Sequence, residues 1–153
     1  MKKLTIGGKE YTIEFTIEAS LYDECVERTV GLMQRLFASA DSEDFEQIIH
    51  AMTDIPKTTL VMLYAGLLEN HSDEVKSLDD AKELIKTLIR ENKEDELLSN
   101  FYGIMQMLME VMQDDGFFKQ IGLEQMMTEI ENETQPEKKA TPKKATTTKV
   151  GEK

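Results

Sequence analysis

The sequence predicts a mainly α-helical protein, in which an N-terminal β-hairpin packs on a compact bundle of about five to six helices and a disordered C-terminal tail follows. Apolar residues alternate with polar ones over residues 4–15, and up to residue 130 they recur every three or four positions. From residue 135 onward apolar side chains almost vanish. The chain of 153 residues therefore divides into one helical domain, residues 1–134, and one tail, residues 135–153.

The first predicted element is a β-hairpin centred on Gly7 and Gly8. Two glycines readily adopt the positive φ that a tight hairpin turn requires. The apolar residues that alternate on either side of this turn are Leu4, Ile6, Tyr11, Ile13 and Phe15. An isolated hairpin is only marginally stable in water, so its apolar face is expected to pack on helices.

Three helices are expected next. The first spans roughly residues 17–38, with Thr16 as its N-cap and a broad apolar stripe. After a polar break, a short helix over residues 43–52 is expected to turn its apolar side chains inward. Pro56 then suits the first turn of a new helix that extends to about residue 70 and should lie at the centre of the domain. The inward side chains expected of the short helix are Phe45, Ile48, Ile49 and Met52.

The remaining helices are delimited by polar residues and glycine. Ser77 and Asp80 have the spacing of a capping box that opens one helix, and a bend is expected near Asn92. The next helix should run from about residue 94 to residue 113, with Gly116 as a C-terminal cap residue. A final short helix then carries Met126, Met127 and Ile130.

Charge is distributed unevenly along the chain. Residues 1–134 hold 12 basic and 28 acidic side chains, a net charge of −16, whereas residues 135–153 hold 6 basic and 2 acidic ones, a net charge of +4. An acidic body repels a phosphate backbone, so the folded part is expected to be a poor nucleic-acid binder. No run of 18 apolar residues exists to span a bilayer, and no membrane contact is expected. The composition of the tail predicts disorder.

Catalytic and metal-binding patterns are missing from the sequence. It contains no phosphate-binding loop, no HExxH, CxxC or GxSxG motif, and only two histidines, His50 and His71. Cys25 is the single cysteine and falls at an apolar position of a helical pattern, which favours a buried packing thiol in a reducing compartment. We therefore expect no catalytic residues, no cofactor, no metal site and no enzymatic activity.

Methionine is the most distinctive local feature. Methionine is flexible and is over-represented on surfaces that accept apolar helices, although it also fills gaps in protein cores. The sequence leaves both interpretations open: core for the residues that share a helical face, and partner groove for the cluster as a whole. The candidate partner-binding residues are Met105, Met107, Met109, Met112, Phe117, Phe118, Met126 and Met127.

Two segments and their order carry a resemblance to a known family. The opening segment is Leu4-Thr5-Ile6-Gly7-Gly8-Lys9-Glu10-Tyr11-Thr12-Ile13-Glu14-Phe15, and the stretch ahead of the last short helix is Asp114-Asp115-Gly116-Phe117-Phe118. With the acidic helical middle between them, they resemble the tail assembly chaperones of long-tailed phages and prophages of Gram-positive bacteria. The resemblance covers about residues 4–130, and its motifs are short and structural.

The resemblance implies a non-enzymatic protein of the host cytoplasm during virion assembly. Such chaperones bind the long, helical tape measure protein, keep it soluble and assist assembly of the tail tube. The implied partners are the tape measure protein, the tail tube protein and a frameshift-extended form of the chain itself. The family brings no catalytic residues and no defined partner-binding motif.

The alternative is a small acidic regulatory protein whose basic tail contacts nucleic acid. It rests on the lysines of residues 135–153, whose binding would weaken as salt rises. Paired lysines at 138–139 and 143–144 also allow an A-rich run in the gene on which a ribosome could slip, as the resemblance would imply. The nucleotide sequence is the check on that point.

Overall fold

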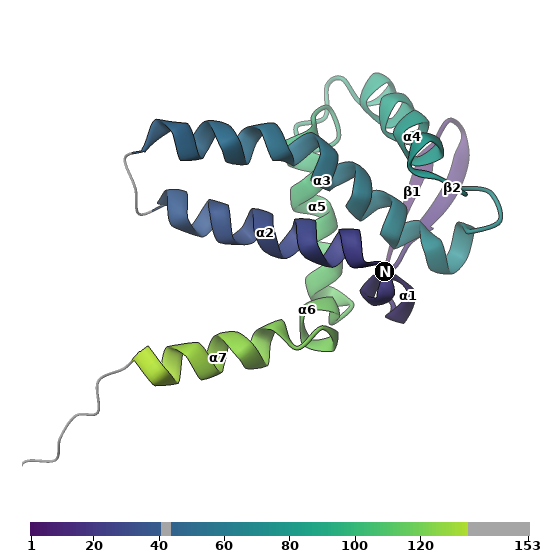
Figure 1. The fold of residues 1–153 in the computed structure, drawn as a ribbon. Coiled ribbons are helices and arrows are strands. Elements are labelled where there is room, and N and C mark those ends of the chain that lie inside the picture. Colours follow the sequence, from purple (N-terminus) through teal and green to yellow (C-terminus); the bar gives the residue numbers. More distant parts are fainter. Residues whose placement is uncertain (41–43, 135–153) are drawn as a thin grey trace, which may run out of the picture.

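The computed structural model describes residues 1–40 and 44–134, and over these ranges it is mainly helical with one N-terminal β-hairpin (Figure 1). This confirms the predicted fold class. The part of the polar break at residues 41–43 and the tail predicted to be disordered, residues 135–153, lie outside the described residues. In the described ranges the last element ends at Thr134.

The hairpin consists of β1 (Lys2–Ile6) and β2 (Lys9–Ile13), paired antiparallel with Leu4 opposite Tyr11 and Ile6 opposite Lys9. Gly7 and Gly8 both have positive φ, 60° and 78°, as a two-residue turn of this kind requires. The alternating apolar side chains all point to one buried face, as predicted. These side chains are Leu4, Ile6, Tyr11 and Ile13.

A break at Tyr22 divides the first predicted helix into α1 (Ile17–Leu21) and α2 (Asp23–Ala40). The backbone of Tyr22 is extended, and its ring packs edge-on against Tyr64, with ring centroids 5.4 Å apart. The change of direction leaves Ile17 and Leu21 exposed, so the first part of the apolar stripe expected over residues 17–38 does not face the core. The break sets the course of α2 away from the hairpin (Figure 1).

The next two predicted helices form one helix, α3 (Phe45–His71), with Pro56 in its interior. Helix α2 packs against α3, with Arg35 paired with Asp54 before the proline and Tyr22, next to the start of α2, packed against Tyr64 after it, and this packing favours the helical path over the local break that proline promotes. The N-terminal part of α3 projects with the end of α2 beyond the other elements (Figure 1). Nothing among the described residues covers the outer face of this α2–α3 hairpin. Side chains expected to point inward are therefore exposed, namely Phe45, Ile48, Ile49 and Met52.

The C-terminal half of α3 is the centre of the core, as predicted, and the hairpin is fastened to it. Glu14 donates its backbone N–H to the carbonyl of Gly66 at 2.9 Å, and Thr12 donates its own to Nε2 of His71 at 2.8 Å. A Cβ on Gly66 would lie 2.7 Å from Ile13 Cγ2, so the glycine permits this close approach. The fully buried apolar side chains of this half are Val61, Met62, Leu63, Ala65 and Leu67.

Helix α4 (Leu78–Glu91) begins with the predicted capping box. Ser77 Oγ accepts from the N–H of Asp80 at 3.2 Å, and Asp80 Oδ2 accepts from the N–H of Ser77 at 3.0 Å. The carboxylate of Glu91, at the other end of α4, accepts from the N–H of Gly7 at 2.9 Å. Helix α4 thus packs against β1 and α3 and closes one side of the hairpin.

Helix α5 (Phe101–Asp114) begins seven residues later than the predicted start at residue 94. Asn100 is its N-cap, with Oδ1 accepting from the N–H of Gly103 at 2.9 Å, and the preceding residues form turns. Gly116, at φ 75°, ends the helix as predicted. Two further helices follow, α6 (Phe117–Gln120) and α7 (Leu123–Thr134), and α7 packs mainly against α6 before it extends away from the core (Figure 1).

Candidate functional site

Five of the eight candidate partner-binding side chains lie in the core, which is one of the two interpretations that the sequence left open. Helix α5 packs against α3 and α6, and its buried positions cover most of its circumference, which explains why even Met107, off the predicted apolar face, is buried. Phe117 packs edge-on against Phe15, with ring centroids 5.7 Å apart. Burial withdraws these side chains from a partner, except that Phe118 also reaches the floor of the hollow described below. The five are Met105, Met107, Met112, Phe117 and Phe118.

The other three predicted residues do reach the surface. Met109 is half-buried at the edge of α5, and Met126 and Met127 of α7 are 52% and 42% exposed. Met109 and Met127 line the same hollow although 18 positions separate them in the sequence. Burial thus confirms the core interpretation for five residues of the cluster, and the partner-groove interpretation stays a prediction for the other three.

This hollow, about 370 Å³ in volume, lies between α2 and α7 over a floor from α5 and α6. A second hollow of about 660 Å³ lies beside α1, the start of α2 and the end of α6. Val26 lines the second and Met33 the first, and these residues are two turns apart on one face of α2. We call the two hollows together the α2–α7 groove. The residues lining the first hollow are Met33, Met109, Glu110, Gln113, Phe118, Leu123, Glu124 and Met127.

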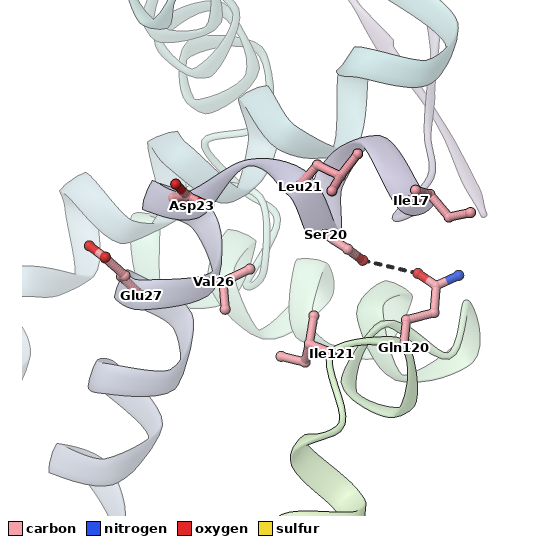
Figure 2. A pocket seen from close by; sticks show the side chains of 8 residues that line it. All are labelled: Ile17, Ser20, Leu21, Asp23, Val26, Glu27, Gln120 and Ile121. Carbon is pink, nitrogen blue, oxygen red and sulfur yellow. Dashed lines mark hydrogen bonds between the residues drawn. The ribbon is translucent and has the colours of Figure 1, made fainter.

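Figure 2 shows the second hollow at close range. Val26 of α2 and Ile121, between α6 and α7, lie across from each other, and Ile17 and Leu21 are the other apolar residues that line the hollow. Ser20 Oγ donates to Gln120 Oε1 at 3.1 Å, a bond that ties α1 to α6 at one side of the hollow. The residues lining this hollow are Ile17, Ser20, Leu21, Asp23, Val26, Glu27, Gln120 and Ile121.

Helices α2 and α7 each carry an apolar stripe, and of these stripes Val26, Met33, Leu123 and Met127 line the groove. On α2, Val26, Val30, Met33 and Phe37 repeat at intervals of three or four residues, and Phe37 is 61% exposed. On α7 the same spacing relates Leu123, Met126, Met127 and Ile130. The sequence contains both stripes, but only the tertiary structure places Leu123 and Met127 of α7 around the same hollow as Met33 of α2.

The charged side chains in the groove are all acidic. The lining residues include Asp23, Glu27, Glu110 and Glu124, and no lysine, arginine or histidine. Helix α7 itself, with the sequence LEQMMTEIENET, carries no basic residue. The groove therefore combines apolar walls with a negative potential at its edges.

The distribution of charge differs at other apolar hollows. One of about 400 Å³, bounded by α3, α4 and the start of α5, is lined by Lys57, Lys82 and Lys86 and by no acidic residue. A neighbouring hollow of about 480 Å³ is lined by exposed side chains of the α2–α3 hairpin, such as Met52, together with Tyr102. The acidic edge is thus a local property of the α2–α7 groove.

The polar groups of the groove do not resemble those of a small-molecule site. Such sites orient their ligand with a few buried polar groups that converge on it. Among the described residues, Thr58 Oγ1 is the one buried side-chain oxygen or nitrogen without a hydrogen-bond partner, and Thr58 lines neither hollow. The charged groups of the groove stand at its edges, where they can meet charges on the surface of a macromolecule.

Cys25 is buried, as predicted. Its neighbour in hydrogen-bond range is Thr29 Oγ1, at 4.0 Å from the sulfur. Burial raises the pKa of the Cys25 thiol to about 12, so almost none of it is the reactive thiolate near neutral pH. His71 has its Nε2 engaged by the N–H of Thr12, and His50 is exposed. The geometry assigns Cys25 and His71 to packing and to the attachment of the hairpin.

We expect the stability of the protein to fall as pH rises from about 8 to about 10, partly because of Cys25. The ordinary thiol pKa is 9.0, so in this range the unfolded chain releases a proton that the native state retains, and the linkage lowers stability by about 1 kcal/mol. Urea unfolding at both pH values measures the loss, and Cys25→Ala should show a smaller one. Equal losses in wild type and Cys25→Ala would contradict this assignment.

The described residues provide no other basis for a site. Within residues 1–40 and 44–134, no three or more histidine, cysteine or carboxylate side chains gather as a metal ion would require. No helix in the same ranges is both long and apolar enough to cross a bilayer. Comparison of the chain with protein-family models, with curated proteins and with solved structures found no match. The resemblance to tail assembly chaperones therefore stays a prediction.

Proposed function

We propose that this protein is a non-enzymatic tail assembly chaperone of a long-tailed phage or prophage, which binds the tape measure protein and keeps it soluble in the host cytoplasm while the tail tube assembles. The resemblance of residues 4–15 and 114–118 to that family supports the proposal. The observation that carries it is the α2–α7 groove, an apolar surface on an otherwise strongly acidic protein.

The shape of the groove suits a helix. Two helices that diverge from a common floor leave room for a third to pack its side chains against both, as in helix-in-groove recognition. The stripes on α2 and α7 have the spacing that would match an apolar stripe on such a helix. The net charge of −12 helps the protein remain soluble while it exposes these side chains.

Co-expression with the tape measure protein tests the proposal. The gene neighbourhood supplies the partner: a tail tube gene upstream and a very long helical reading frame downstream are expected. The wild-type chain should keep the product of that frame soluble and co-purify with it. If the product stays insoluble and unbound, the proposed function is wrong.

Met127→Glu should reduce the amount of co-purified tape measure protein about tenfold or more, because the contact would bury a charge against apolar side chains. Gln125→Glu is the matched control, because this substitution adds the same charge to α7 at a residue that does not line the groove. Both substitutions are on exposed positions, so the fold should persist. Equal loss, or no loss, in the two variants would argue against the groove as the binding site.

A further inference from the structure

From the charge of the groove we infer that its occupant is an amphipathic helix whose apolar stripe is bordered by lysine or arginine. This inference rests on the proposed role of the groove as a helix-binding site. It adds that the bound segment is basic. Neither the fold nor the proposed function requires this property of the partner.

The acidic side chains stand where such a border would lie. Glu27 is on α2, Glu110 on α5 and Glu124 on α7, so carboxylates border the groove from all three helices. No cation among the lining residues neutralises them, and Lys119, the neighbour of Gln120, is exposed and lines neither hollow. A long basic side chain can lay its methylene groups on the apolar wall and place its charge beside these carboxylates.

The lysines at the hollow between α3 and α4 strengthen the argument. Lys57, Lys82 and Lys86 line an apolar hollow that has no acidic lining residue, although Lys86 is paired with Glu83 at 2.6 Å and Lys82 lies 4.0 Å from Asp79. The charges that line this hollow are therefore less favourable to a basic helix than those of the α2–α7 groove, whose lining residues include no cation.

The length of the groove bounds the bound segment. The apolar stripe of α2 extends eleven positions from Val26 to Phe37, roughly 17 Å at the rise of an α-helix, and Val26 and Met33 of this stripe line the two hollows. A helix of about three turns would span this stripe, and its apolar residues would recur at every third or fourth position.

The test uses the full chain and three synthetic peptides of about 18 residues. The first has a leucine stripe bordered by lysines, the second has the same stripe bordered by glutamates, and the third has the composition of the first in scrambled order. We expect the lysine-bordered helix to bind at least about tenfold tighter than the other two, and its affinity to fall as salt rises. Fluorescence anisotropy of labelled peptides measures the affinities.

Charge-neutralising variants locate the binding. Glu27→Gln with Glu110→Gln should weaken binding of the lysine-bordered peptide about three- to tenfold, as expected for two partly solvated ion pairs. The control, Asp73→Asn with Glu94→Gln, removes the same charge from exposed positions outside the groove and should leave affinity unchanged.

The inference would be overturned if the scrambled peptide bound as tightly as the ordered one, or if the lysine- and glutamate-bordered helices bound with equal affinity. Equal weakening of binding in the two double variants, or failure of the protein to bind any of the peptides, would overturn it as well. The proposed function is judged separately by capture of the tape measure protein, so a captured partner without preference for basic helices would reject this inference alone. Binding of the lysine-bordered helix without capture would reject the function alone.

Discussion

Phe117→Ala is expected to lower the free energy of unfolding by about 3–5 kcal/mol, a large part of the total stability of a domain of this size. Phe117 is fully buried, and its ring lies edge-on to both Phe15 and Phe118, each with a centroid distance of 5.7 Å. It joins the end of the hairpin to α6, so its removal leaves a cavity between elements that lie far apart in the sequence. Urea unfolding followed by circular dichroism measures the change.

Met127→Ala is the contrasting variant, since both residues were predicted from sequence to bind a partner. Met127 is exposed on α7, and its truncation should change stability by less than about 0.5 kcal/mol. The comparison separates core from groove within the same cluster. A Phe117→Ala protein as stable as Met127→Ala would contradict the packing described for α6.

Gly103→Ala is expected to destabilise the protein by about 1–3 kcal/mol or more, although alanine ordinarily favours helices over glycine by about 1 kcal/mol. A Cβ at this position would lie 2.2 Å from the carbonyl oxygen of Leu97 and 2.6 Å from its Cα. These are backbone atoms, so no rotamer change can relieve the clash. Asp95 holds that turn by accepting from the N–H groups of Leu97 and Leu98 at 2.8 and 2.9 Å.

Gly31→Ala provides the control for helix propensity. In α2 the atom nearest to a Cβ at Gly31 is Arg35 Nη2 at 3.5 Å, an ordinary contact. This substitution should therefore stabilise the protein by about 0.4–1 kcal/mol, opposite in sign to Gly103→Ala. Thermal unfolding of the two variants beside wild type measures both changes, and a stabilising Gly103→Ala would show that the turn before α5 does not approach the helix as described.

Local patterns predicted the elements that depend on neighbouring residues. The Gly7–Gly8 turn, the Ser77–Asp80 capping box and the Gly116 terminator each act through hydrogen bonds or φ values within a few positions. The predicted helix boundaries are wrong where packing between residues far apart in the sequence outweighs the conformational preference of the local residues. Pro56 lies inside one continuous helix because α2 packs along α3, and the turn held by Asp95 delays α5 until Asn100 can cap it.

The candidate site was harder to predict from the sequence than the fold was, because it depends on how distant elements pack together. Periodicity identified the apolar stripe of α7, but the methionines of α5 carry the same composition signal, and no pattern within the sequence separates a buried Met107 from an exposed Met127. The two methionines differ in burial because neighbouring helices cover α5, which packs against α3 and α6, whereas α7 extends from α6 with its sides exposed.

The sequence by itself determined a mainly helical domain with an N-terminal hairpin, a buried thiol and a strongly acidic surface, because these properties follow from composition and from contacts between near neighbours. Only the tertiary structure decided that α2 and α7 contribute to one hollow, that a second hollow lies two turns back along α2, and that carboxylates from three helices line the two hollows. The physical reason is that a groove between elements depends on the directions in which helices leave the core, and these directions are set by packing among residues that lie about a hundred positions apart, such as Ser20 and Gln120.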